Sequence, residues 1–196
     1  MDEKIKNAEE SFLIIKEMIE NEKVRFNENG FVYLFWGWLA IFTVAIEYAL
    51  HFSGVRQSYY AWYTMILGGI FMFFYFWKKN KNRKGSASMP LTGRVLSTTW
   101  IFVGLNIFTF AFLFPEIAGK LLPFFILALL GIATIISGAL LRFTCLTMGG
   151  IICNILAFVT IFTNPIYCGV IYIVAIIFAD LIPGYMLRAK YRNQHV

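Results

Sequence analysis

Six apolar stretches follow one another along the chain after a polar N-terminal segment of thirty residues. Each is close to the length of about 20 residues that an α-helix needs to cross the hydrocarbon core of a membrane. The pattern predicts spanning helices at residues 31–50, 59–77, 95–114, 121–141, 145–163 and 166–187. The expected fold class is therefore an all-α, polytopic membrane bundle of six transmembrane helices.

The first thirty residues differ from the rest, because apolar and charged positions alternate there in a helical pattern. Apolar side chains recur at Ile5, Ala8, Phe12, Ile15, Ile19 and Phe26. This spacing predicts an amphipathic helix over residues 1–30. Its eight acidic residues outnumber its five Lys and Arg residues, so we expect it to pack on a basic cytoplasmic surface or on a second copy of itself rather than on anionic lipid. A solvated acidic arm is the alternative.

Composition agrees with a membrane protein and leaves no room for a large soluble domain. Hydrophobic residues make up 59% of the chain and charged residues only 14%, whereas about a quarter of the residues of a soluble domain are charged. The net charge of +6 is concentrated beside apolar segments, which favours a role in topology over direct binding of nucleic acid. The three cysteines show no CxxC spacing, and His51 and His195 are the only histidines, so neither a metal site nor a cofactor is expected.

One connection between the apolar stretches is strongly basic. Residues 78–94 contain no acid and six basic residues, Lys78, Lys79, Lys81, Arg83, Lys84 and Arg94. Because positive charge in short loops resists translocation, this loop is predicted to be cytoplasmic. Both termini are then cytoplasmic, and fifteen of the seventeen Lys and Arg residues lie on that side. The predicted domains are a cytoplasmic helix over 1–30, a transmembrane domain over 31–187 and a cytoplasmic tail over 188–196.

Three polar side chains are predicted to lie deep in the membrane. Asp180 comes eight residues before the first basic residue of the tail, and Asn106 and Asn154 each come twelve residues after a basic residue of the cytoplasmic side. These separations correspond to about 12 Å and about 18 Å of helix, so the three are expected to form one polar cluster. Pro183 and Gly184 predict a helix break beside the acid. The cluster has two readings, a hydrogen-bonded link between helices or a site of transport or sensing.

Two further groups of residues have simpler interpretations. Glu47, His51 and Arg56 fall near the outer boundary of the membrane, where the acid can reach the interface or pair with the arginine. Small residues recur at every fourth position of the fifth apolar stretch, at Cys145, Gly149, Cys153 and Ala157. Such a ridge lets helix backbones approach one another in lipid, which favours packing within one bundle, with a dimer interface as the alternative.

No motif of a known enzyme class is present, and an enzyme is not expected. The chain lacks HExxH, a GxSxG nucleophile motif with an intramembrane histidine, and a glycine-rich phosphate loop. The favoured function is a non-catalytic interaction or sensory and regulatory membrane subunit, whose cytoplasmic helix and basic loop contact a protein partner. The alternative is a small permease or channel for a cation, a proton or a neutral solute, built around Asp180.

The N-terminal part of the chain resembles the opening of a group of small bacterial membrane proteins. The likeness covers about the first fifty residues and rests on the segments Ile15-Lys-Glu-Met-Ile-Glu20, Glu28-Asn-Gly-Phe31 and Leu34-Phe-Trp-Gly-Trp-Leu39. The resemblance implies a six-helix protein of the bacterial cytoplasmic (inner) membrane with a cytoplasmic N-terminal helix, and it brings no assigned activity. Members of the group tend to be accompanied by small winged-helix regulators, so the resemblance also implies a regulator as a partner.

Overall fold

The computed structural model describes residues 30–55, 57–81, 91–113 and 121–194. Within these ranges the chain forms six helices that are long and apolar enough to cross a membrane, which confirms the predicted all-α bundle. The first five are α2 (Phe31–Phe52), α3 (Tyr63–Lys81), α4 (Leu91–Leu113), α6 (Leu122–Leu141) and α7 (Thr144–Phe162). A short 3-10 helix, η1 (Ser58–Trp62), precedes α3. The predicted amphipathic helix over 1–30 lies outside the described residues, except for Gly30.

The sixth span is built from three consecutive elements. They are α8 (Pro165–Ile176), the π-helical turn η3 (Ile177–Leu181) and α9 (Ile182–Gln194). Together they give one apolar span over Pro165–Lys190. The helix α9 continues to Gln194, so most of the segment predicted as a tail is helical.

Local sequence explains where several helices begin and end. Asn164 caps α8, because its side-chain oxygen accepts a hydrogen bond of 3.2 Å from the backbone N–H of Ile166. Pro165 follows at the first helical position, where a missing N–H costs nothing. At the end of α6, Arg142 adopts a left-handed conformation with φ 50°. The N–H of Phe143 then bonds back to the carbonyl of Gly138 at 2.9 Å, which closes the tight turn into α7.

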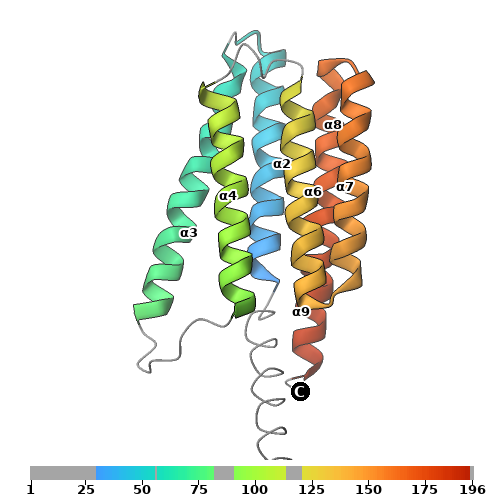
Figure 1. Ribbon diagram of the computed structural model, residues 1–196. Coiled ribbons are helices and arrows are strands. Elements are labelled where there is room, and N and C mark those ends of the chain that lie inside the picture. Colours follow the sequence, from blue (N-terminus) through green and yellow to red (C-terminus); the bar gives the residue numbers. More distant parts are fainter. Residues whose placement is uncertain (1–29, 56, 82–90, 114–120, 195–196) are drawn as a thin grey trace, which may run out of the picture.

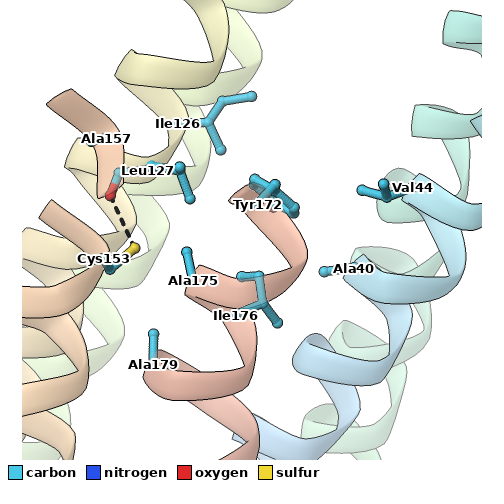
Figure 2. Packing of buried hydrophobic residues seen from close by; sticks show 10 residues of the cluster. All are labelled: Ala40, Val44, Ile126, Leu127, Cys153, Ala157, Tyr172, Ala175, Ile176 and Ala179. Atoms are coloured by element: carbon cyan, nitrogen blue, oxygen red, sulfur yellow. Dashed lines mark hydrogen bonds between the residues drawn. The ribbon is translucent and has the colours of Figure 1, made fainter. Parts of the chain in front are cut away.

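The core lies where α2, α6, α7 and the sixth span meet (Figure 1). Figure 2 shows its buried members, which are Ala40, Val44, Ile126, Leu127, Cys153, Ala157, Tyr172, Ala175, Ile176 and Ala179. Several are alanines, and small side chains let helix backbones approach closely in lipid. The thiol of Cys153 reaches across to the carbonyl of Leu127, at 3.3 Å.

The predicted ridge on the fifth apolar stretch faces this core. Cys153 and Ala157 are fully enclosed, and Cys145 is half-buried. A Cβ added at Gly149 would overlap the carbonyl oxygen of Phe178, so α7 passes very close to the sixth span at this glycine. The ridge therefore serves packing within one bundle.

Two helices lie at the edge of the core, to which α3 contributes Met65 and α4 contributes Ile107. Figure 1 shows α3 leaning away from the rest. The helix α4 packs on α6. Only 11% of the α4 span and 17% of the α3 span are buried, compared with 44% of the α6 span. Most of the surface of α3 and α4 is therefore available to lipid.

The basic residues of the described ranges all lie at one end of the bundle. Figure 1 shows that α2 begins, α3 ends, α4 begins, α6 turns into α7, and α9 ends at this same end. The Lys and Arg residues in the described ranges are Lys78, Lys79, Lys81, Arg94, Arg142, Arg188, Lys190 and Arg192. We call this the basic end, and the opposite one the far end. The described chain thus starts and finishes at the same end after six passes.

Candidate functional site

The candidate site is built around Asp180, which belongs to the π-helical turn η3. Its side chain is only 6% exposed. It faces α2 at Gly37, where an added Cβ would lie 3.2 Å from the Cβ of Asp180. Gly37 is six residues into α2, so the acid lies about 9 Å from the start of that helix. The glycine allows the α2 backbone to pass directly over the acid.

The carboxyl group of Asp180 has no polar partner within the described ranges. No hydrogen bond or ion pair joins it to any residue of 30–55, 57–81, 91–113 or 121–194. Its electrostatic neighbours are the neutral side chains of Tyr33, Cys153 and Tyr172, from α2, α7 and α8. Buried polar groups in proteins are almost always hydrogen-bonded, so an enclosed acid without a partner is exceptional.

A second group of polar side chains lies between α2, α6 and α4, and Tyr33 is its member in electrostatic contact with the acid. The hydroxyl of Tyr33 lies next to that of Ser137, which is fully buried on α6. The indole N–H of Trp100 donates to the Ser137 oxygen at 3.1 Å, and the Ser137 hydroxyl donates to the carbonyl of Ala133 at 2.7 Å. Tyr33 therefore lies between Asp180 and a hydrogen-bonded link that reaches α4.

The predicted helix break at Pro183 and Gly184 is not observed. The helix runs on through both residues, and the irregularity lies just before them, in η3, where the N–H of Ile182 bonds to the carbonyl of Ile177. Proline has no N–H, so a carbonyl of the preceding turn loses its usual donor. The wider π-helical turn accommodates this loss without ending the helix. Pro183 itself is fully buried, and Gly184 packs against Leu34 of α2.

The other two members of the predicted polar cluster lie elsewhere. Asn106 is exposed on α4, and its side-chain amide donates to the carbonyl of Phe102 in its own helix, at 2.7 Å. Asn154 is half-buried and faces α6, where a Cβ at Gly131 would overlap its amide nitrogen. It donates to the carbonyl of Gly150 at 3.1 Å. Asp180, Asn106 and Asn154 therefore do not form the predicted cluster, because the three helices present them in different directions.

The polar residues predicted near the outer boundary lie toward the far end. The carboxylate of Glu47 accepts a hydrogen bond of 2.8 Å from the indole N–H of Trp62. The sequence did not predict this contact. His51 is exposed and its ring lies against Phe52. Arg56 lies outside the described residues. The neighbouring Tyr48 donates its hydroxyl proton to the carbonyl of Ile166, which ties α2 to α8.

The residues of the predicted basic loop are distributed over two helices. Lys78, Lys79 and Lys81 form the last turn of α3, and Arg94 is in the first turn of α4. Arg83 and Lys84 lie outside the described residues. The connection between the two helices is thus shorter than the predicted 78–94, because both helices extend into it.

Some residues around Asp180 carried only a weak signal in the sequence. Tyr33 and Gly37 are four residues apart and share one face of α2. Ser137, which lies next to Tyr33, is one small polar residue within an apolar stretch. Among the described residues, no group of three or more His, Cys, Asp or Glu side chains could hold a metal ion.

Comparison of the chain with protein-family models, with curated proteins and with solved structures finds no match in any of the three.

Proposed function

We propose that the protein is a small permease that moves a proton or an alkali cation across the membrane, with Asp180 as the carboxylate that binds it. The observation that carries this proposal is the enclosed acid without a polar partner in the described part of the chain. Ionisable groups inside a membrane are costly, and they commonly mark ion pathways or proton relays. A carboxyl group that makes no hydrogen bond or ion pair with the described residues is available to take up and release a cation.

The local backbone supports the same role. Carbonyl groups near a carboxylate can complete a cation site where a membrane helix departs from regular geometry. Here Asp180 itself belongs to the π-helical turn, Pro183 follows three residues later, and π-helical turns are frequent at functional sites. Gly37 and Gly149 place α2 and α7 in close contact with this turn.

The competing structural explanation has less support. An acid that only joins helices should be bound to a partner, and the two predicted amide partners make hydrogen bonds within their own helices instead. No described Lys, Arg or His side chain stabilises a negative charge on Asp180. A purely structural role would leave an unfavourable buried group with no compensating bond.

The test is ion flux in liposomes that contain the purified full chain. A pH-sensitive dye in the lumen reports proton entry, and imposed Na⁺ and K⁺ gradients test the alkali cations. We expect the wild-type protein to give flux above that of empty liposomes. Asp180→Asn should reduce the flux to that of empty liposomes, because an amide has no negative charge to bind a cation and does not take up a proton near neutral pH. Asp180→Glu should keep part of the flux.

The matched control is Glu47→Gln, which changes the other acid in the described ranges. Its carboxylate is already engaged by Trp62 near the far end, and glutamine keeps an oxygen that can accept that bond. We therefore expect this variant to keep wild-type flux. Wild-type flux equal to that of empty liposomes, or unchanged flux in Asp180→Asn, would contradict the proposal.

A second function is a non-catalytic sensory or regulatory subunit that contacts a protein partner at the basic end. It is favoured by the concentration of exposed basic side chains there, including Arg188, Lys190 and Arg192 on α9. Such a surface attracts an acidic partner segment. Absence of flux in the intact protein would favour this second function over the first.

The proposed location is the bacterial cytoplasmic membrane, with the basic end and both termini in the cytoplasm. The support is the charge asymmetry, since the eight Lys and Arg residues of the described ranges all lie at one end. Positive charge close to spanning helices favours the cytoplasmic side.

A further inference from the structure

A hollow of about 470 Å³ lies on the outer side of α4, near the basic end. Its lining residues are Arg94, Val95, Thr98, Thr99 and Phe102, and we call it the α4 hollow. We propose that it is a binding site for one anionic phospholipid, whose phosphate meets Arg94 and whose acyl chains follow Phe102. This inference does not depend on the proposed transport function.

The end of the hollow near the membrane surface offers hydrogen-bond donors that nothing else occupies in the described part of the chain. Arg94 is exposed and forms no ion pair with any described residue. The hydroxyls of Thr98 and Thr99 form no hydrogen bond with any described residue. The adjacent Ser97 behaves differently, because its hydroxyl donates to the carbonyl of Gly93 at 2.7 Å. A guanidinium group binds phosphate through two parallel hydrogen bonds, and hydroxyls one helical turn away can add to them.

The deeper end of the hollow is apolar. Phe102 is eight residues after Arg94, which places it about 12 Å further along the helix. It is 59% exposed, and Ile101 and Leu105 continue an exposed apolar surface beyond it. The order from guanidinium through hydroxyls to aromatic ring matches the order of phosphate, glycerol and acyl chain in a phospholipid.

Within the described residues, the charges near the hollow favour an anionic lipid over a zwitterionic one. The acids in the described ranges are Glu47 and Asp180. The first is toward the far end and the second is enclosed by other helices, so neither can meet the ammonium group of a zwitterionic headgroup in the α4 hollow. Lys78 and Lys81 lie at the same end and add positive potential. Basic pockets on the cytoplasmic side of membrane helices bind anionic headgroups for this reason.

The test is native mass spectrometry of the full chain in detergent, titrated with phosphatidylglycerol or with phosphatidylcholine. We expect the wild-type protein to bind one phosphatidylglycerol with an affinity about tenfold above that for phosphatidylcholine. Both lipids offer a phosphate to Arg94, but only phosphatidylcholine brings an ammonium group, which the positive potential of this end repels. Arg94→Gln should remove this preference. Thr98→Val combined with Thr99→Val should weaken binding by a smaller factor while leaving the charge unchanged.

The matched control is Arg188→Gln, which removes an exposed positive charge from α9 at the same end, away from the α4 hollow. It should bind phosphatidylglycerol as the wild type does. Equal loss of binding in Arg94→Gln and Arg188→Gln would show that net charge, not the hollow, attracts the lipid, and would overturn the proposal. Equal binding of the two lipids by the wild type, or displacement of the bound lipid by inorganic phosphate alone, would also overturn it. The double threonine variant keeps the test decisive if Arg94→Gln does not fold.

Discussion

Glu47 and Asp180 are the two acids in the described ranges, and the fold gives them different surroundings. Glu47 is half-buried and accepts a hydrogen bond of 2.8 Å from Trp62. Asp180 is more deeply enclosed and has no hydrogen-bond partner among the described residues. The first arrangement is typical of a stabilising contact, and the second of a group kept available for a function. The difference lies in the neighbours and not in the residue type.

The contact between Trp62 and Glu47 predicts a measurable loss of stability in Trp62→Phe. The substitution removes the donor N–H and keeps an aromatic ring, so we expect the free energy of unfolding to fall by about 1 kcal/mol, as for other hydrogen bonds between membrane helices. Equilibrium unfolding in mixed micelles with a denaturing detergent measures it. Trp77→Phe is the control, because Trp77 is exposed and donates no hydrogen bond in the described part of the chain. Equal effects of the two substitutions would contradict a stabilising role for the bond.

At the scale of elements, the sixth span is the most irregular helix of the described chain. Its π-helical turn lies between two regular helices and carries both Asp180 and the carbonyl of Phe178 that meets Gly149. Glycine is needed at that position because any Cβ would overlap this carbonyl. The close approach of α7 to the turn is thus a condition for enclosing the acid.

This close approach predicts a large effect of Gly149→Ala. The added methyl group has to push α7 away from the sixth span, and overpacking of this kind costs about 1–3 kcal/mol in the free energy of unfolding. The same detergent unfolding experiment measures the change. Gly104→Ala on α4 is the matched control, since a Cβ there meets nothing within 4 Å. We expect that control to leave stability unchanged or to raise it by up to about 1 kcal/mol, because alanine favours a helix over glycine. Similar losses in both variants would argue against the contact.

For the whole molecule, the separation of charge between the two ends supports the proposed orientation. The Lys and Arg residues of the described ranges lie at the basic end, and Arg56, in the connection between α2 and η1, is outside the described residues. The helices α3 and α4 lie at the edge of the bundle, where α3 contacts α2 and α4 contacts α6, and they are less buried than the α6 span. The proposed orientation in the membrane therefore depends on the charges at the two ends of the bundle. The packing of the bundle depends on the helices between the two ends.

The orientation predicts the outcome of thiol labelling in intact cells. A cysteine introduced as Ser53→Cys, at the far end, should react with a membrane-impermeant reagent from outside, whereas Lys190→Cys at the basic end should react only after the membrane is opened. Both positions are exposed. The wild-type chain is the control for background, since Cys153 and Cys168 are buried and Cys145 is half-buried. Reaction of Lys190→Cys in intact cells would reverse the proposed topology.

The number of spans, their approximate limits and the shared end for start and finish follow from the sequence alone. Apolar stretches of sufficient length are a local property, and lipid leaves an α-helix as the simplest way to satisfy their backbone hydrogen bonds. Asp180 was recognised for the same reason, because an acid in an apolar stretch is unusual whatever surrounds it. The sequence also predicts the approximate depth of Asp180 in the membrane, since depth is counted along one helix.

Only the tertiary structure decided which side chains meet at that depth. Asn106 points to the surface of α4, Asn154 faces Gly131, and Asp180 faces Gly37. Counting residues gives the height of a group in the membrane but not its direction around the helix. In a soluble protein the contrast of apolar and polar faces supplies that direction, whereas here both the core and the lipid are apolar. The direction of each helix face is therefore set by packing between helices, above all where glycines allow their backbones to touch.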